Sequence, residues 1–192
     1  MKKTLTTEQK LNISVFLGLL GAAVLVGIDQ LTKWLVVENL TLHVPVHLIK
    51  IGEQQVLNLT YYLNDGAAFS MFGGKTAMLI CVTSLMMGAM MCAMVMKHVR
   101  RIPYIVAFSM IIGGGVGNLI DRIFNDGKVV DFIDVRIINF AIFNFADICA
   151  VCGGLLLCAL VIIDEIKESR DKKENTSEGK DTSDTVTDNG ND

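Results

Sequence analysis

Two acidic residues, Asp131 and Asp147, lie close to the start of the last long apolar segment of the chain. Two neighbouring carboxyl groups can hydrolyse a peptide bond by holding a water molecule between them, because one takes a proton from the water while the other donates a proton to the carbonyl oxygen. When they are close together they cannot both ionise easily, so they share a proton and titrate as a pair. We therefore predict that Asp131 and Asp147 work together.

Further polar residues accompany this pair at the edges of apolar segments, namely Asn118, Asp121, Arg122 and Asn144. Ionisable groups at the edge of a hydrocarbon layer are costly, so they mark a candidate functional site. The amide and guanidinium groups among them can bond to the backbone of a substrate or hold the acids in place. Alternatively, Asp121, Arg122 and Asp147 form ion pairs that only hold helices together.

Four apolar segments are long enough to cross a membrane as helices. The chain has 192 residues, of which 52% are hydrophobic and 19% are charged, and its mean hydropathy is +0.49. A membrane-spanning helix needs about 20 predominantly apolar residues. We predict an all-α membrane protein with transmembrane helices over residues 11–28, 76–96, 102–120 and 140–163. A cleaved signal peptide is the alternative for the first segment, but its apolar run is longer than is usual in such peptides.

The distribution of lysine and arginine predicts the orientation of these helices, because short basic flanks favour the cytoplasmic side. Basic residues precede the first segment, fill the short connection after the second and follow the fourth. Both termini are therefore predicted in the cytoplasm, and residues 29–75 and 121–139 are predicted to face outward. The candidate site then lies at the outer face of the cell membrane.

The outward connection after the first helix has the pattern of β-strands. Apolar and polar residues alternate along residues 57–64, which is typical of a half-exposed strand. Pro45 confines the preceding strand to a sheet edge or a strand start. We predict a small extracytoplasmic β element over residues 42–69, between the first two helices, and we expect Asp131 in a short loop that returns to the helices.

The two ends of the chain are polar. Residues 1–10 are predicted to form a short cytoplasmic lead. Residues 164–192 lack the apolar content that offsets the entropy cost of ordering, so we predict a disordered cytoplasmic tail. This leaves residues 11–163 as the membrane domain, which we expect to be a monomer.

The cysteines and histidines do not indicate a metal or redox site. None of the five cysteines lies in an outward loop, and Cys149 and Cys152 are interpreted as small packing residues of a membrane helix. We predict no metal and no cofactor, because His43, His47 and His98 are scattered and no carboxylate cluster has ligand spacing. The net charge of -3 comes mostly from the tail, and we expect no nucleic-acid partner.

Asp29 and Lys33 stand four residues apart at the outer end of the first apolar segment. If the helix continues to that point, the two side chains face each other. The spacing alone is also typical of an ion pair at the membrane interface, with Trp34 as an aromatic anchor beside it.

Five short motifs occur in one order along residues 10–165. They are Asp29-x-x-Thr32-Lys33, Asn64-x-Gly66-x-Ala68-Phe69, Asn118-x-x-Asp121-Arg122, Val129-Val130-Asp131-Phe132 and Phe143-Asn144-x-Ala146-Asp147. Each motif is weak by itself, but their order together with four apolar segments is highly specific. The chain resembles the lipoprotein signal peptidase family, also called signal peptidase II.

This resemblance implies a bacterial aspartic peptidase that cleaves prolipoproteins before a diacylglyceryl-modified cysteine, with membrane lipids around it and no cofactor. It implies that Asp131 and Asp147 are the catalytic pair. The positions that match residues for substrate binding or support of the site are Asn64, Gly66, Asn118, Arg122 and Asn144, and those that match the structural pair of the family are Asp29 and Lys33.

Two other classes of protein remain as alternatives. In a small transporter or channel, Asp147 and Arg122 would line a polar path through the membrane. The sequence shows no inverted repeat, however, and its acids gather at one face of the membrane. In a structural or assembly protein, the same polar residues would only hold helices together.

Overall fold

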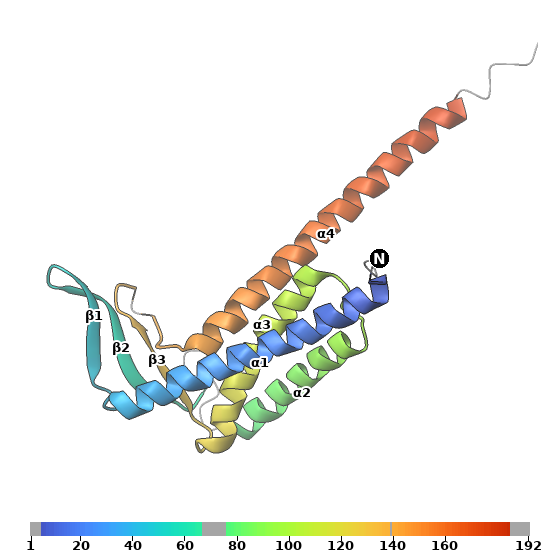
Figure 1. Ribbon diagram of the computed structural model, residues 1–192. Helices are drawn as coiled ribbons and strands as arrows, with labels where there is room; N and C mark the ends of the chain where they lie inside the picture. Colours follow the sequence, from blue (N-terminus) through green and yellow to red (C-terminus); the bar gives the residue numbers. More distant parts are fainter. Residues whose placement is uncertain (1–4, 67–75, 139, 185–192) are drawn as a thin grey trace, which may run out of the picture. The chain divides into compact units, whose positions relative to one another are not determined.

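The residues that the structure describes form seven helices and strands in the order α1, β1, β2, α2, α3, β3 and α4 (Figure 1). A computed structural model describes residues 5–66, 76–138 and 140–184. The bounds are α1 Thr7–Asn39, β1 Pro45–Ile51, β2 Gln54–Asn64, α2 Thr76–Val95, α3 Ile102–Phe124, β3 Val129–Val135 and α4 Phe145–Asp184. The chain divides into two compact units, Met1–Gly154 and Leu155–Asp192.

Four of the described helices are long and apolar enough to cross a membrane, which confirms the predicted multi-pass architecture. These spans are Thr7–Asn39, Thr76–Val95, Ile102–Phe124 and Phe145–Lys172. The first helix begins earlier than predicted because Thr6 and Gln9 form a capping box, in which each side chain accepts a hydrogen bond from the backbone N–H of the other.

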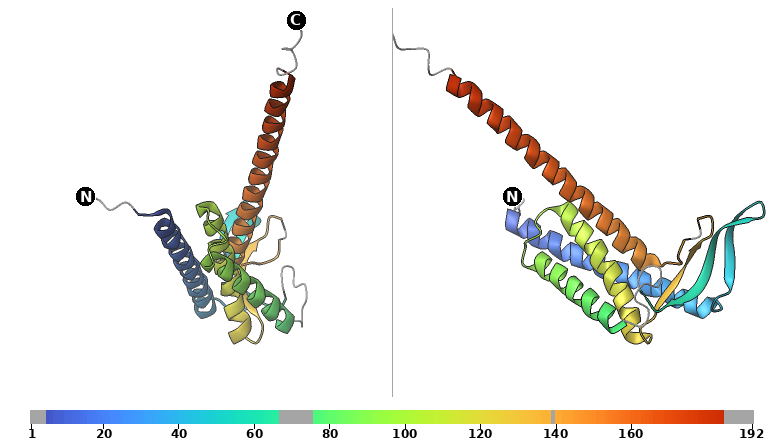
Figure 2. Two further views of the ribbon diagram at one scale, coloured as in Figure 1. Left: turned by 90° about the vertical axis from the view of Figure 1, so that its right-hand side faces the viewer. Right: turned by 180° about the vertical axis from the view of Figure 1, so that it is seen from behind.

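Within the first unit, α1, α2 and α3 lie side by side (Figure 1, Figure 2). Their shared core consists of apolar side chains from all three helices, namely Val15, Ala22, Met87, Met94, Ile105 and Ile112. Large apolar side chains on the outer surfaces remain exposed, among them Phe16 at 65% and Leu85 at 77%. An exposed apolar surface of this kind is suited to lipid, which solvates it without cost.

Two glycines of α3 allow unusually close approach of neighbouring groups. A Cβ atom on Gly114 would overlap the carbonyl oxygen of Ala146 and lie 2.8 Å from the backbone nitrogen of Ala150 in α4. A Cβ atom on Gly117 would lie 2.5 Å from Oδ2 of Asp29 in α1. The glycine cluster therefore brings α3 against both the first and the last helix.

The sheet is three-stranded and antiparallel, in the order β1-β2-β3. The prediction of strands between the first two helices is confirmed for β1 and β2, but the predicted loop around Asp131 is wrong, because this segment is strand β3. Leu59 pairs with Ile133 and Tyr62 pairs with Asp131, with a register shift between them. β3 is buried along most of its length, with Asp131 and Asp134 among its buried residues. Its sequence therefore lacks the alternation that marks a half-exposed strand.

The second unit consists of the continuation of α4 through Asp184. This differs from the disordered tail predicted from residue 164. The segment contains neither glycine nor proline before Gly179, and Lys172 forms an ion pair of 2.7 Å with Glu168 one turn earlier. Residues without helix breakers and with such pairs favour helix even when they are polar.

Candidate active site

Asp147 lies in the first turn of α4. The fourth helix begins at Phe145 and not at residue 140, because Phe143 runs beside β3 and forms a bridge with Ile133. Asn144 and Asp147 then form a reciprocal cap: the Asn144 side chain accepts from the Asp147 N–H at 3.0 Å, and Oδ2 of Asp147 accepts from the Asn144 N–H at 3.0 Å. A carboxylate is favourable at this end of a helix.

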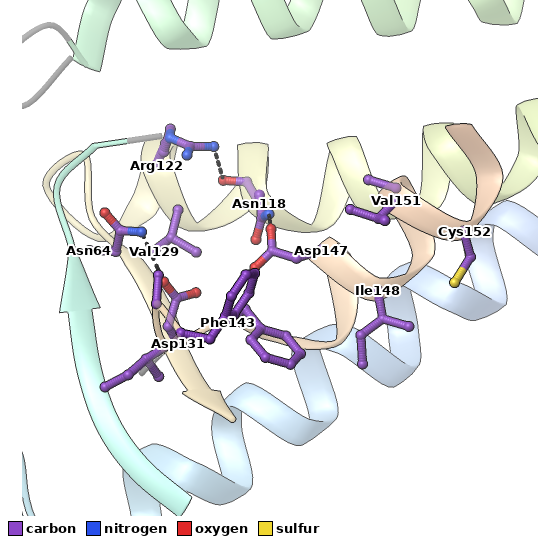
Figure 3. A pocket seen from close by; sticks show the side chains of 14 residues that line it. Asn64, Asn118, Arg122, Val129, Asp131, Phe143, Asp147, Ile148, Val151 and Cys152 are labelled. Atoms are coloured by element: carbon purple, nitrogen blue, oxygen red, sulfur yellow. Dashed lines mark hydrogen bonds between the residues drawn. The ribbon is translucent and has the colours of Figure 1, made fainter. Parts of the chain in front are cut away.

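Asp131 lies on β3 and is only 2% exposed. Each of its oxygens accepts a hydrogen bond from an asparagine amide. Asn64 at the end of β2 donates to Oδ2 at 2.9 Å, and Asn144 donates to Oδ1 at 2.7 Å. The first of these bonds is drawn in Figure 3, where Asn64 and Asp131 face each other across the two strands. The sequence motifs around residues 64, 131 and 144 therefore meet at one place.

Asn118 and Asn144 join the two aspartates into one network. Asn118 Nδ2 donates to Oδ1 of Asp147 at 2.8 Å (Figure 3). The side-chain amide of Asn144 donates both to Asp131 and to Oδ1 of Asn118, the latter at 2.9 Å. Asp131 and Asp147 thus lie on different elements, but they are bridged by shared amides.

Burial raises the pKa of Asp131 to about 7, and the negative charge of Asp147 adds to this rise. The hydrogen bonds from Asn64 and Asn144 act in the opposite direction, because they favour the ionised form. At neutral pH, the carboxyl group of Asp131 therefore retains a proton part of the time. A carboxyl pair that holds one proton has both an acid and a base available.

Asp29 and Lys33 form an ion pair of 2.8 Å, as their spacing predicts, and both side chains are buried inside the protein. Asp29 is 0% exposed and Lys33 is 3% exposed. The sequence did not reveal that Lys33 also contacts Asp121 at 3.0 Å and Asn118 at 2.9 Å. Asp121 therefore pairs with Lys33 and not with its sequence neighbour Arg122.

Gln30 is a further member of this network that no sequence motif indicated. Its side-chain amide donates to Asp121 at 2.9 Å, to Asp29 at 3.2 Å and to the carbonyl oxygen of Gly117 at 3.1 Å. Its position beside Asp29 was the only available signal, and a glutamine next to a charged residue is too common to identify it.

Arg122 and Gly66 lie at the other side of the site. Arg122 Nη2 donates to the carbonyl oxygen of Gly66 at 3.0 Å, and the Gly66 N–H donates to Oδ1 of Asn64 at 2.9 Å. Arg122 Nε is buried and has no hydrogen-bond partner within the described parts of the chain. Ala68 and Phe69, which belong to the same sequence motif as Gly66, lie outside the described residues.

These groups face one cavity of about 410 Å³ (Figure 3), which is within the usual range for a small-molecule site. Its polar lining residues are Asn64, Asn118, Arg122, Asp131 and Asp147. The remaining wall is mainly apolar and comes from residues 140–143 and the first turns of α4. A cavity with polar side chains beside an apolar wall suits a ligand that has both a polar and an apolar part.

Two solved structures that resemble this one are described as bacterial membrane enzymes determined by the in meso method. One has a TM-score of 0.70 at 30% sequence identity, over 77% of this chain and 88% of that chain. A second has a TM-score of 0.66 at 30% identity, over 75% of this chain and 91% of that chain. Together with the four apolar helices, these similarities define the class of the protein as a multi-pass membrane enzyme.

The sequence identifies the family within this class. Residues 21–163 match the profile described as signal peptidase (SPase) II. The lipoprotein signal peptidase of Halalkalibacterium halodurans is 37% identical over 79% of this chain and 95% of its own length. That of Caldicellulosiruptor bescii is 41% identical over 72% of this chain and 85% of its own length. The chain belongs to the signal peptidase II family, as its motifs predicted.

Proposed function

We propose that the protein is a membrane-embedded aspartic endopeptidase that cleaves prolipoproteins immediately before a diacylglyceryl-modified cysteine. Membership of the signal peptidase II family supports the removal of signal peptides from lipoproteins. The observation that carries the aspartic mechanism is the network in which Asn118 and Asn144 bridge Asp131 and Asp147.

In the proposed reaction, a water molecule between the two carboxyl groups attacks the scissile carbonyl carbon. Asp147 takes the proton of this water, and Asp131, whose pKa is raised to about 7, donates its proton to the carbonyl oxygen. When the tetrahedral intermediate collapses, Asp147 passes its proton to the leaving amine of the cysteine. Asp131 recovers a proton from the hydroxyl group that becomes the new carboxyl group, so the pair returns to its starting state.

The other site residues position the substrate in this proposal. Arg122 and Gly66 lie next to Asn64 at the polar end of the cavity, and the buried Nε of Arg122 has no hydrogen-bond partner among the described residues. The apolar wall along the first turns of α4 suits the signal helix or the lipid chains of a prolipoprotein. Membrane lipids surround the exposed apolar surface of the helices, and we propose that the protein acts as a monomer.

We further propose that both termini lie in the cytoplasm and that the site opens at the outer face of the cell membrane. The basic residues that flank the helices support this orientation. Asp147 and Arg122 lie at the ends of their helices, in the first turn of α4 and the last turn of α3. This position supports a site at the membrane surface more than a transport path through the bilayer centre.

The test is cleavage of a purified, diacylglyceryl-modified prolipoprotein by the protein in detergent. Asp131→Asn and Asp147→Asn are expected to lower the cleavage rate by at least a thousandfold, because each leaves the pair without its acid or its base. Asp126→Asn is the matched control, since Asp126 is exposed and close in sequence. Full cleavage by a folded dyad variant would refute the dyad, and no cleavage by the unchanged protein would refute the peptidase function.

A further inference from the structure

A buried cluster of three charged groups lies directly behind the candidate site. It consists of Asp29 and Lys33 of α1 and Asp121 of α3, which we call the Lys33 cluster. The Lys33 ammonium group contacts Asp29 at 2.8 Å and Asp121 at 3.0 Å, and the side chains of all three are at most 3% exposed. Groups so completely removed from water are costly unless every oxygen and N–H finds a partner.

The remaining partners of the two carboxylates are backbone N–H groups. Asp29 Oδ1 accepts from the N–H of Ala146 at 3.0 Å, and Asp121 Oδ2 accepts from the N–H of Val130 at 3.0 Å. Ala146 immediately precedes Asp147, and Val130 immediately precedes Asp131. Each carboxylate of the cluster therefore holds the backbone next to one member of the dyad.

Lys33 also acts on the dyad through Asn118. Its ammonium group donates to Oδ1 of Asn118 at 2.9 Å, while Nδ2 of the same amide donates to Asp147 at 2.8 Å. Because an amide has one oxygen and one NH₂ group, fixing the oxygen toward Lys33 turns the donor toward Asp147. The cation thus determines which end of the amide faces the candidate base.

A cluster that only held α1 against α3 could satisfy its remaining carboxylate oxygens with any buried N–H groups. Here the partners are the backbone N–H groups directly before each aspartate of the dyad, on two further elements, β3 and α4. Gln30 completes the cluster, because its amide donates to both Asp29 and Asp121. The cluster therefore connects α1 to three elements of the site: β3 and α4, which carry the dyad, and α3, which carries Asn118.

We propose that the Lys33 cluster is a positioning device, which sets the separation of Asp131 and Asp147 and the direction of the Asn118 amide. This inference rests on the proposed peptidase function. Lys33, Asp29 and Asp121 are positioning residues here, since they act through Val130, Ala146 and Asn118.

Substitutions at Asp121 can distinguish the effect of its negative charge from the effect of its acceptor oxygens. In Asp121→Asn, the remaining oxygen can still accept from Val130 and Lys33, and Gln30 can turn its own oxygen toward the new NH₂ group. In Asp121→Ala, both acceptors are lost. We expect kcat within threefold of the unchanged protein for Asp121→Asn and at least tenfold lower for Asp121→Ala, with KM within twofold for both.

The pH profile distinguishes positioning from general stability. The charged groups that face Asp131 are Asp147 on α4, Lys33 on α1 and Arg122 on α3. If Asp131 and Asp147 move apart in Asp121→Ala, the charge of Asp147 raises the pKa of Asp131 less. Asp131 then loses its proton at a lower pH, so kcat begins to fall at a lower pH on the alkaline side of its profile. In Asp121→Asn the alkaline side of the profile is expected to stay unchanged. Glu8→Ala is the matched control, because Glu8 also forms an ion pair, of 2.9 Å with Lys97, but with a side chain that is 75% exposed.

The outcomes separate this inference from the proposed function. The inference that the Lys33 cluster positions the dyad is overturned if Asp121→Ala keeps its kcat and pH profile, or if Asp121→Asn loses as much activity as Asp121→Ala. If Asp121→Ala does not fold, Gln30→Leu replaces it, because this change leaves all three charges in place; an unchanged kcat then overturns the inference. Cleavage by the unchanged protein but not by Asp131→Asn shows in the same assay that the peptidase function stands independently.

Discussion

Asp131 and Asp147 have different surroundings although one hydrogen-bond network through Asn118 and Asn144 joins them. Asp131 lies within a buried strand and its pKa is raised to about 7. Asp147 lies at the N-terminus of α4, where it accepts from the Asn144 N–H and the Asn118 amide. Each oxygen of Asp147 therefore has its own N–H donor. In the proposed mechanism, different surroundings let one pair of like groups provide both an acid and a base.

The raised pKa of Asp131 predicts a cost in stability that depends on pH. The native state holds this proton up to about pH 7, whereas an unfolded chain releases it near pH 4. The protein therefore loses stability as the pH rises between these values, and the loss is complete above about pH 7. Asp131→Asn removes this cost. The free energy of unfolding of Asp131→Asn, compared with that of the unchanged protein, should be more favourable at pH 8 than at pH 5 by roughly 2 kcal/mol. Thermal unfolding in detergent at the two pH values measures this difference.

A control for this prediction is Asp126→Asn, whose carboxyl group is exposed. Its melting temperature should follow that of the unchanged protein at both pH values. An equal effect of Asp131→Asn at pH 5 and pH 8 would contradict a raised pKa at this position.

Among the structural elements, α3 has the strictest packing requirement. Its glycines face the backbone of α4 and the carboxylate of Asp29. Gly114→Ala is expected to force α3 and α4 apart, because a backbone carbonyl cannot move aside as a flexible side chain can. Overpacking of this kind costs about 1–3 kcal/mol, and we expect a lower melting temperature together with slower cleavage, since the displaced Ala146 precedes Asp147.

Gly88→Ala in α2 provides the comparison, because a Cβ atom at Gly88 meets no atom within 4 Å. Alanine is a better helix former than glycine, by roughly 0.5–1 kcal/mol. This variant should therefore keep or raise the melting temperature. A similar loss in both variants would mean that the contact between α3 and α4 is not the cause.

The elements that the sequence predicted well are those with a strong local signal. Long apolar runs identified four helices, and alternation identified β2. The local pattern failed for β3 because a strand buried on both faces has no alternation. It failed for the start of α4 because residues 140–143 are apolar without being helical. The cap formed by Asn144 and Asp147 explains that boundary, but its motif was interpreted only as part of the site.

The sequence predicted only in part which side chains meet at the candidate site. The motifs at Asn64, Asn118 and Asn144 were expected near the dyad, and the structure brings their side chains to it. The roles of Gln30 and Asp121 were not predicted, because these two residues are 91 positions apart in the sequence and only the fold brings them into contact. No local spacing carries such information.

For the whole molecule, the orientation across the membrane is the main prediction. A reporter enzyme that works only outside the cytoplasm should be active when the chain is truncated and fused after Gly52, in the turn between β1 and β2. It should be inactive when the fusion follows Arg100, between α2 and α3, because the lysine and arginine residues there favour the cytoplasmic side. Reporter activity in the reverse pattern would contradict the proposed outer face of the site.

The hydrogen bond from Ala146 to Asp29 joins two residues that are 117 positions apart. During synthesis, Asp29 and Lys33 enter the membrane long before Ala146 is made, and as neighbours on one helix they can neutralise each other on the way. The Asp147 carboxylate and its cap arrive only with the last helix. In the proposed mechanism, an unfinished chain lacks half of the dyad, so we expect proteolytic activity only once the membrane domain is completely synthesised.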